Sequence, residues 1–180
     1  MKFNRLAVAG LMVLAVASLF ALGGCTSEST RSVLTVVSVN DGSTYYSDLI
    51  NQADSANPFI PVDDIKVKLG NVPHDGSAPL APGAPFSEIV VTGYTVTYSD
   101  GVYAPISGGM NLRIPSGGTT EGTIAISNPS EKAALLATIT STVTSTASIV
   151  FTGYVRTSGN FGDNVTSTGT LTVQVDNFGD

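Results

Sequence analysis

The feature that most constrains the fold is a hydrophobic period of two that recurs from residue 33 onward. Residues 65–69, 110–114 and 171–175 each carry apolar side chains at the first, third and fifth positions, with polar or charged side chains between them. Successive side chains of a strand point to opposite faces, so each segment predicts a strand with one buried and one solvated face.

Seven strands are expected in all. The other four lie at residues 33–39, 88–99, 121–127 and 143–156, and residues that favour turns separate them. Strands with one buried face each need a second layer to cover that face. The sequence therefore predicts an all-β fold over residues 33–180, an antiparallel sandwich of about seven strands in two sheets.

One short helix is expected between the fifth and sixth strands. Asn128 is a favoured N-cap, Pro129 suits the first helical position, and Glu131 stands three residues after the cap. This helix is predicted to carry the chain from one sheet to the other.

Residues 93–98, Gly-Tyr-Thr-Val-Thr-Tyr, resemble the third strand of fibronectin type III and related immunoglobulin-like domains. The resemblance implies an immunoglobulin-like arrangement of the sandwich. It concerns architecture alone, because the chain lacks the Trp of those cores and its single Cys forms no disulfide within the chain.

Alternation assigns the core-facing side chains of the two longest predicted strands. In residues 88–99 they are Val90, Tyr94, Val96 and Tyr98. In residues 143–156 they are Ala147, Ile149, Phe151 and Val155, which turns Tyr154 and Arg156 outward. Gly93 and Gly153 are expected at bulges or bends.

The N-terminus has the layout of a secretory signal. Lys2 and Arg5 precede an uncharged apolar run over residues 6–22, and two glycines follow. As a helix the run would cover about 26 Å, which is short for a hydrocarbon core of about 30 Å.

The end of this segment, Leu22, Gly23, Gly24 and Cys25, resembles the lipobox of bacterial lipoproteins. The resemblance implies cleavage before Cys25 and lipidation of Cys25 with a diacylglycerol thioether and an N-acyl chain. The expected organisation is a signal peptide at 1–24, the lipidated Cys and a polar tether at 25–32, and the sandwich at 33–180. An ordinary signal with an incidental Cys, or a retained anchor helix, is the alternative.

Two or more acyl chains hold a protein stably on a bilayer. Thr26 follows the Cys, as in lipoproteins that are exported onward. The expected location is therefore outside the cytoplasm and anchored to a bacterial membrane, most simply the outer membrane.

Charge and composition exclude several function classes. The 14 acidic residues outnumber the 8 basic ones, for a net charge of −6, and this argues against nucleic acid as a partner. One Cys and one His are too few for an ordinary zinc, haem or iron–sulfur site. No cofactor is expected.

Few residues suggest catalysis. His74 stands beside Asp75 and near Ser77, but three such residues in one loop do not assemble a triad. Asp63 and Asp64 are adjacent, so on a strand they point oppositely and mark its start, with Asp64 outward. We expect no enzyme.

Other residues suggest binding. Turns at 40–42, 100–101, 160–164 and 176–180 offer Asn and Asp oxygens to a structural calcium ion, although turn preference explains them equally.

Three tyrosines form either an aromatic platform or the edge of the core: Tyr45, Tyr46 and Tyr103. The irregular stretches 40–63 and 70–86 are candidate binding loops.

The sequence predicts a lipid-anchored envelope or cell-surface lipoprotein that acts as a non-enzymatic binding or assembly module with a protein partner. The alternative is a carbohydrate-binding or calcium-stabilised module.

Overall fold

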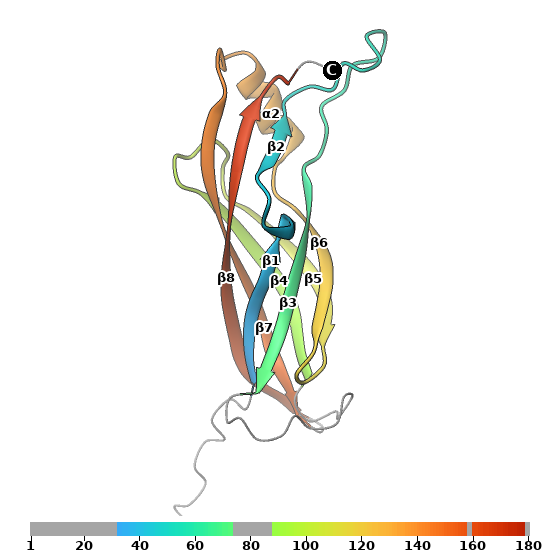
Figure 1. Ribbon diagram of the computed structural model, residues 1–180, viewed down its shortest axis with the longest axis vertical. Helices are drawn as coiled ribbons and strands as arrows, with labels where there is room; N and C mark the ends of the chain where they lie inside the picture. Colours follow the sequence, from blue (N-terminus) through green and yellow to red (C-terminus); the bar gives the residue numbers. More distant parts are fainter. Residues whose placement is uncertain (1–31, 74–87, 158–159, 179–180) are drawn as a thin grey trace, which may run out of the picture. The chain divides into compact units, whose positions relative to one another are not determined.

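The computed structural model describes residues 32–73, 88–157 and 160–178, which belong to one compact unit, Ser32–Asp180 (Figure 1). In chain order its elements are β1 (Ser32–Val39), the 3-10 turn η1 (Asn40–Gly42), β2 (Tyr45–Asp48), β3 (Asp64–Pro73), β4 (Glu88–Tyr98), β5 (Ile106–Ile114), β6 (Thr119–Ala125), α2 (Pro129–Leu136), β7 (Val143–Thr157) and β8 (Asn160–Asp176). The all-β prediction is confirmed. The number of seven strands is wrong, because these ranges hold eight.

The strands form two sheets with the orders β1-β3-β6 and β2-β8-β7-β4-β5. All pairs are antiparallel except β2 with β8, which run parallel. Buried apolar side chains of both sheets form one hydrophobic core. In Figure 1, β1 and β2 follow one another along β8.

The strand that sequence reasoning missed is β2. The sequence predicts an irregular stretch over 40–63, but its first part turns sharply and then pairs with the end of β8. Asn40 and Asp41 take the left-handed backbone conformation, with φ of 47° and 52°. Four residues are too few to show a period of two, and the partner strand lies far along the chain.

Strand boundaries also differ from the expected ones. β8 begins at Asn160 rather than at residue 171, and β5 begins at Ile106 rather than at 110. The added parts are rich in Thr, Ser, Gly and Asn, so they lack the apolar alternation on which the prediction depended.

A bulge in β4 changes which side chains of its first half face the core. As predicted, three residues of its second half lie in the core: Tyr94, Val96 and Tyr98. The pairing register shifts between Val91 and Gly93, and before that shift Ile89 and Val91 contribute to the core. The assignment of Val90 to the same face is wrong, because a bulge reverses the alternation; Val90 is buried outside the core cluster.

The core face of β7 is confirmed: Ala147, Ile149, Phe151 and Val155 are buried. Arg156 is exposed, and its Nη1 lies 3.4 Å from Oε2 of Glu88 on β4. Tyr154 is half-buried. The register shift of this strand falls beside Gly153, between Tyr154 and Arg156.

The short helix is also confirmed. The side chain of Asn128 accepts a hydrogen bond of 3.1 Å from the Ser130 N–H, and Pro129 is the first helical residue. α2 connects β6 of the smaller sheet with β7 of the larger one. Among the described residues, no helix is long and apolar enough to cross a membrane.

The observed facing of β4 gives a test with neighbouring residues. Val96→Asp should lower the free energy of unfolding by several kcal/mol, because Val96 is 0% exposed and a buried carboxylate without a partner is costly. Thr97→Asp is the matched control, since Thr97 is exposed, and it should have little effect. Urea denaturation measures both, and equal losses would contradict this facing.

Candidate functional site

The most unusual feature of the interior is a fully buried ion pair. Lys132 Nζ of α2 lies 2.6 Å from Oδ1 of Asp63, the residue before β3, and the two side chains are 0% and 2% exposed. Taking both charges out of water costs several kcal/mol each unless attraction and hydrogen bonds compensate. The surroundings of the pair should therefore be polar.

Hydroxyl groups supply that polarity. Asp63 Oδ2 accepts hydrogen bonds from Ser47 Oγ at 2.5 Å and Ser127 Oγ at 2.7 Å. Asp63 Oδ1 also accepts a hydrogen bond from Tyr45 OH at 3.3 Å. These five side chains, Asp63, Lys132, Ser47, Ser127 and Tyr45, are called the Asp63 cluster below.

Four segments meet in the Asp63 cluster, and the chain just before β3 contributes Asp63 itself. β2 contributes Tyr45 and Ser47, which share one face because strand side chains alternate. The segment after β6 contributes Ser127, and α2 contributes Lys132, whose Nζ also donates to the Asp48 carbonyl at 2.8 Å. The Ile126 N–H donates to the Asp63 carbonyl at 2.8 Å and so holds these segments together.

Two further tyrosines border the cluster. Tyr103 OH lies 2.8 Å from Ser47 Oγ, and the Tyr103 ring packs edge-on against Tyr98, with ring centroids 5.2 Å apart. Tyr98 OH donates to the Ile126 carbonyl at 2.6 Å. Burial raises the pKa of the Tyr45, Tyr98 and Tyr103 hydroxyls well above the ordinary value, and the charge of Asp63 adds to the rise. All three remain protonated donors.

The tyrosine platform considered from the sequence does not form. Tyr45 and Tyr103 belong to the edge of the core, as in the alternative interpretation. Tyr46 is 61% exposed and packs edge-on against Phe178, with ring centroids 5.6 Å apart.

Sequence reasoning placed Asp63 and Asp64 correctly on opposite sides but gave Asp63 no role. Asp64 is exposed and Asp63 is buried. No local pattern marks Lys132 as buried, because its partner lies 69 residues away. The two residues meet only through the crossing of α2 between the sheets.

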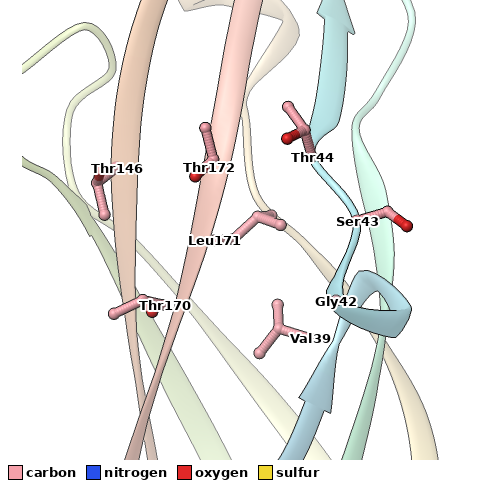
Figure 2. A pocket seen from close by; sticks show the side chains of 8 residues that line it. All are labelled: Val39, Gly42, Ser43, Thr44, Thr146, Thr170, Leu171 and Thr172. Carbon is pink, nitrogen blue, oxygen red and sulfur yellow. The ribbon is translucent and has the colours of Figure 1, made fainter.

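A second feature is a small surface pocket beside β8, with a volume of about 170 Å³ (Figure 2). The segment that joins β1 to β2 contributes Val39, Gly42, Ser43 and Thr44, and the two long strands contribute Thr146, Thr170, Leu171 and Thr172. None of these side chains is charged. The pocket therefore offers hydroxyl groups, two apolar side chains and backbone to a ligand.

The pocket lies beside the residues of β8 that precede its pairing with β2. β2 pairs with β8 from Val173 to Asp176, and in the described part of the chain no strand is paired with that side of β8 at Thr170–Thr172. Nearer its start, β8 lies against β1, because a Cβ on Gly169 would be 2.9 Å from methyl groups of Val36 and Val39. β1 belongs to the other sheet and is not paired with β8, so among the described strands Thr170, Leu171 and Thr172 lie on an unpaired edge of β8, directly before the residues that pair with β2.

Two of the acidic side chains considered for calcium, Asp100 and Asp176, accept other hydrogen bonds. Asp100 accepts hydrogen bonds from Ser145 Oγ at 2.6 Å and the Val102 N–H at 3.1 Å, and these bonds, the Ser145 bond above all, lower its pKa. Asp176 accepts from the Thr142 hydroxyl. Among the described residues, no three Asp, Glu, His or Cys side chains cluster as metal ligands would.

Several predicted site residues lie outside the described residues. They are Leu22, Gly23, Gly24 and Cys25 of the lipobox, and His74, Asp75 and Ser77 of the second loop. Asp180, the last residue of the turn at 176–180 considered for calcium, also lies outside them.

No protein-family model matches the sequence, and no curated protein matches it. Among solved structures, the chain is similar to the N-terminal domain of PorA, with 12% identity and a TM-score of 0.26 over 83% of this chain and 100% of that chain. A likeness of this size bears on neither fold nor function.

The buried tyrosines predict a stability loss in alkali. Unfolded tyrosine has a pKa of about 10, whereas Tyr45, Tyr98 and Tyr103 have raised values in the folded chain. The folded state therefore holds protons that the unfolded state releases, and stability falls as the pH rises above about 10. A phenolate absorbance titration should show these three groups ionising together with unfolding; reversible ionisation of all tyrosines in the folded chain would contradict the burial.

Proposed function

We propose that this protein is an exported lipoprotein, anchored to a bacterial membrane by acyl chains on Cys25, whose β-domain is a non-enzymatic binding module. The compact unit begins at Ser32, at the end of the polar segment 25–32. This boundary supports the proposal, because the tether then ends where folded structure begins. Residues 26–32 would reach about 24 Å when extended.

The proposal includes an immunoglobulin-like arrangement of the two sheets. In that fold one sheet holds the first, second, fourth and fifth strands, and the other holds the third, sixth and seventh. The strand in the fourth position, β5, lies in the larger sheet here instead. Leaving aside β2 and β5, the orders β1-β3-β6 and β8-β7-β4 follow this scheme. β2 and β5 then extend the larger sheet at its two edges.

The observation that carries the binding role is the open edge of β8 at Thr170–Thr172, with its pocket. An unpaired strand edge binds an extended peptide by main-chain hydrogen bonds, and a neighbouring pocket takes one side chain. A protein partner with a short, uncharged extended segment fits this site best. No aromatic ring lines the pocket, which favours a peptide over a sugar as the ligand.

The Asp63 cluster supports a non-enzymatic role for the ionisable groups it holds. Asp63 and Lys132 are 2% and 0% exposed, so no substrate from solution reaches them in the folded domain.

Cys25→Ser tests the anchor. The variant should be released from membranes or remain unprocessed, because the acylation site is lost. A radiolabelled fatty acid should label the wild-type chain but not the variant. Ser27→Ala, in the proposed tether, is the control and should remain lipidated. Retention of a processed Cys25→Ser chain on membranes would contradict the proposal.

A photoreactive amino acid tests the binding edge. Placed at Thr170 in living cells, it should form an adduct with an envelope protein, and the adduct should disappear when Thr172→Arg fills the pocket. The control position is Thr166, which is exposed on the same face of β8 but does not line the pocket. Equal adducts from both positions would contradict a site at this edge.

A further inference from the structure

We propose that Lys132 and Asp63 condense into an intramolecular amide, with loss of one water molecule, which cross-links α2 to the start of β3. The inference goes beyond the binding role and does not depend on it. It rests on the geometry of the Asp63 cluster.

The two reacting groups are held together and kept dry. Lys132 Nζ lies 2.6 Å from Asp63 Oδ1, and the side chains are 0% and 2% exposed. Fixing two groups in contact makes their reaction effectively unimolecular, with effective molarities that reach about 10⁵ M or more. Excluding water also removes the solvent that would hydrolyse the product.

The first step is a proton transfer along the existing hydrogen bond, from the Lys132 ammonium to Asp63 Oδ1. It produces a neutral amine and a neutral carboxylic acid. The nitrogen lone pair then attacks Asp63 Cγ, forming the C–N bond and moving the carbonyl electron pair onto Oδ2.

The cluster is arranged to stabilise the charge that develops on Oδ2. Ser47 Oγ and Ser127 Oγ already donate hydrogen bonds to this oxygen, at 2.5 Å and 2.7 Å. Preorganised donors at a developing oxyanion lower the barrier of an acyl transfer, and removal of one such donor costs about 10²–10³ in rate.

Oδ1 is the leaving oxygen, and it has its own donor. Tyr45 OH donates to Oδ1 at 3.3 Å, so it can pass a proton to this oxygen and regain one from the nitrogen. The C–Oδ1 bond then breaks and Oδ1 leaves as water, with one proton received directly from Nζ and one from Tyr45 OH, which regains a proton from the nitrogen. Oδ2 becomes the amide carbonyl. No oxidant or other reagent is needed.

The product also suits the site better than the ion pair. A neutral amide removes two buried charges and their desolvation cost. Asp48 O, which accepts from Nζ at 2.8 Å, can still accept from the amide N–H. The link would join residues 63 and 132 across the fold in a chain whose single Cys allows no internal disulfide.

A tryptic digest of the denatured full-length protein tests the proposal directly. Trypsin cuts after free Lys and Arg, and an acylated Lys132 resists it. Linked protein should yield residues 32–66 joined to residues 114–156, lighter by one water than the sum of the two peptides. Unlinked protein yields three separate peptides, residues 32–66, 114–132 and 133–156. Separate peptides from the purified wild-type chain would overturn the proposal, whatever any variant does.

Variants identify the chemistry. Lys132→Arg keeps a positive charge but should not condense, so residues 32–66 should appear free. Lys68→Arg is the matched control, because Lys68 pairs with Glu121 at the surface, and the link should persist. The double variant Ser47→Ala, Ser127→Ala should slow the appearance of the linked peptide by at least tenfold in newly synthesised chain; an unchanged rate would exclude the role of the two hydroxyls.

Discussion

The structure depends on the contact between Lys132 and Asp63. Removing one partner of a buried ion pair leaves an uncompensated charge, at a cost of about 3–5 kcal/mol. Both groups are satisfied only while β2 and the segment after β6 lie against them, because β2 supplies Ser47 Oγ and the Asp48 carbonyl and the segment after β6 supplies Ser127 Oγ. A polar contact thus specifies how this part of the domain is assembled, in a way that apolar packing alone does not.

The tyrosines of β4 extend the same constraint across the core. Tyr98 OH donates to the Ile126 carbonyl, and Tyr94 OH accepts from the Ala125 N–H at 3.2 Å. Two tyrosine side chains of the larger sheet therefore form hydrogen bonds with backbone groups at the end of β6 in the smaller sheet. The Tyr94 ring requires Gly108 on β5, since a Cβ there would lie 2.5 Å from the ring. Tyrosine suits these positions because its body is apolar and its end forms hydrogen bonds.

The shortness of β2 links the buried cluster to the surface pocket. β2 carries Ser47 and Tyr45 to Asp63 and pairs with β8 from Val173 onward. β2 is only four residues long and ends its pairing at Val173, so within the described ranges residues 170–172 have no strand partner on that side of β8. The proposed binding edge and the proposed cross-link therefore depend on the same four-residue strand.

The amino-acid sequence alone determined the all-β class, the helix capped by Asn128 and the core face of β7, because these follow from alternation and local hydrogen bonding. It also supplied the whole case for the proposed lipid anchor at Cys25. Tertiary structure decided the bulge that reverses Val90, the pairing of β2 with β8, the pocket and the burial of Lys132. Each of these depends on residues far apart in the chain, and a local pattern holds no information about a partner that only folding brings near.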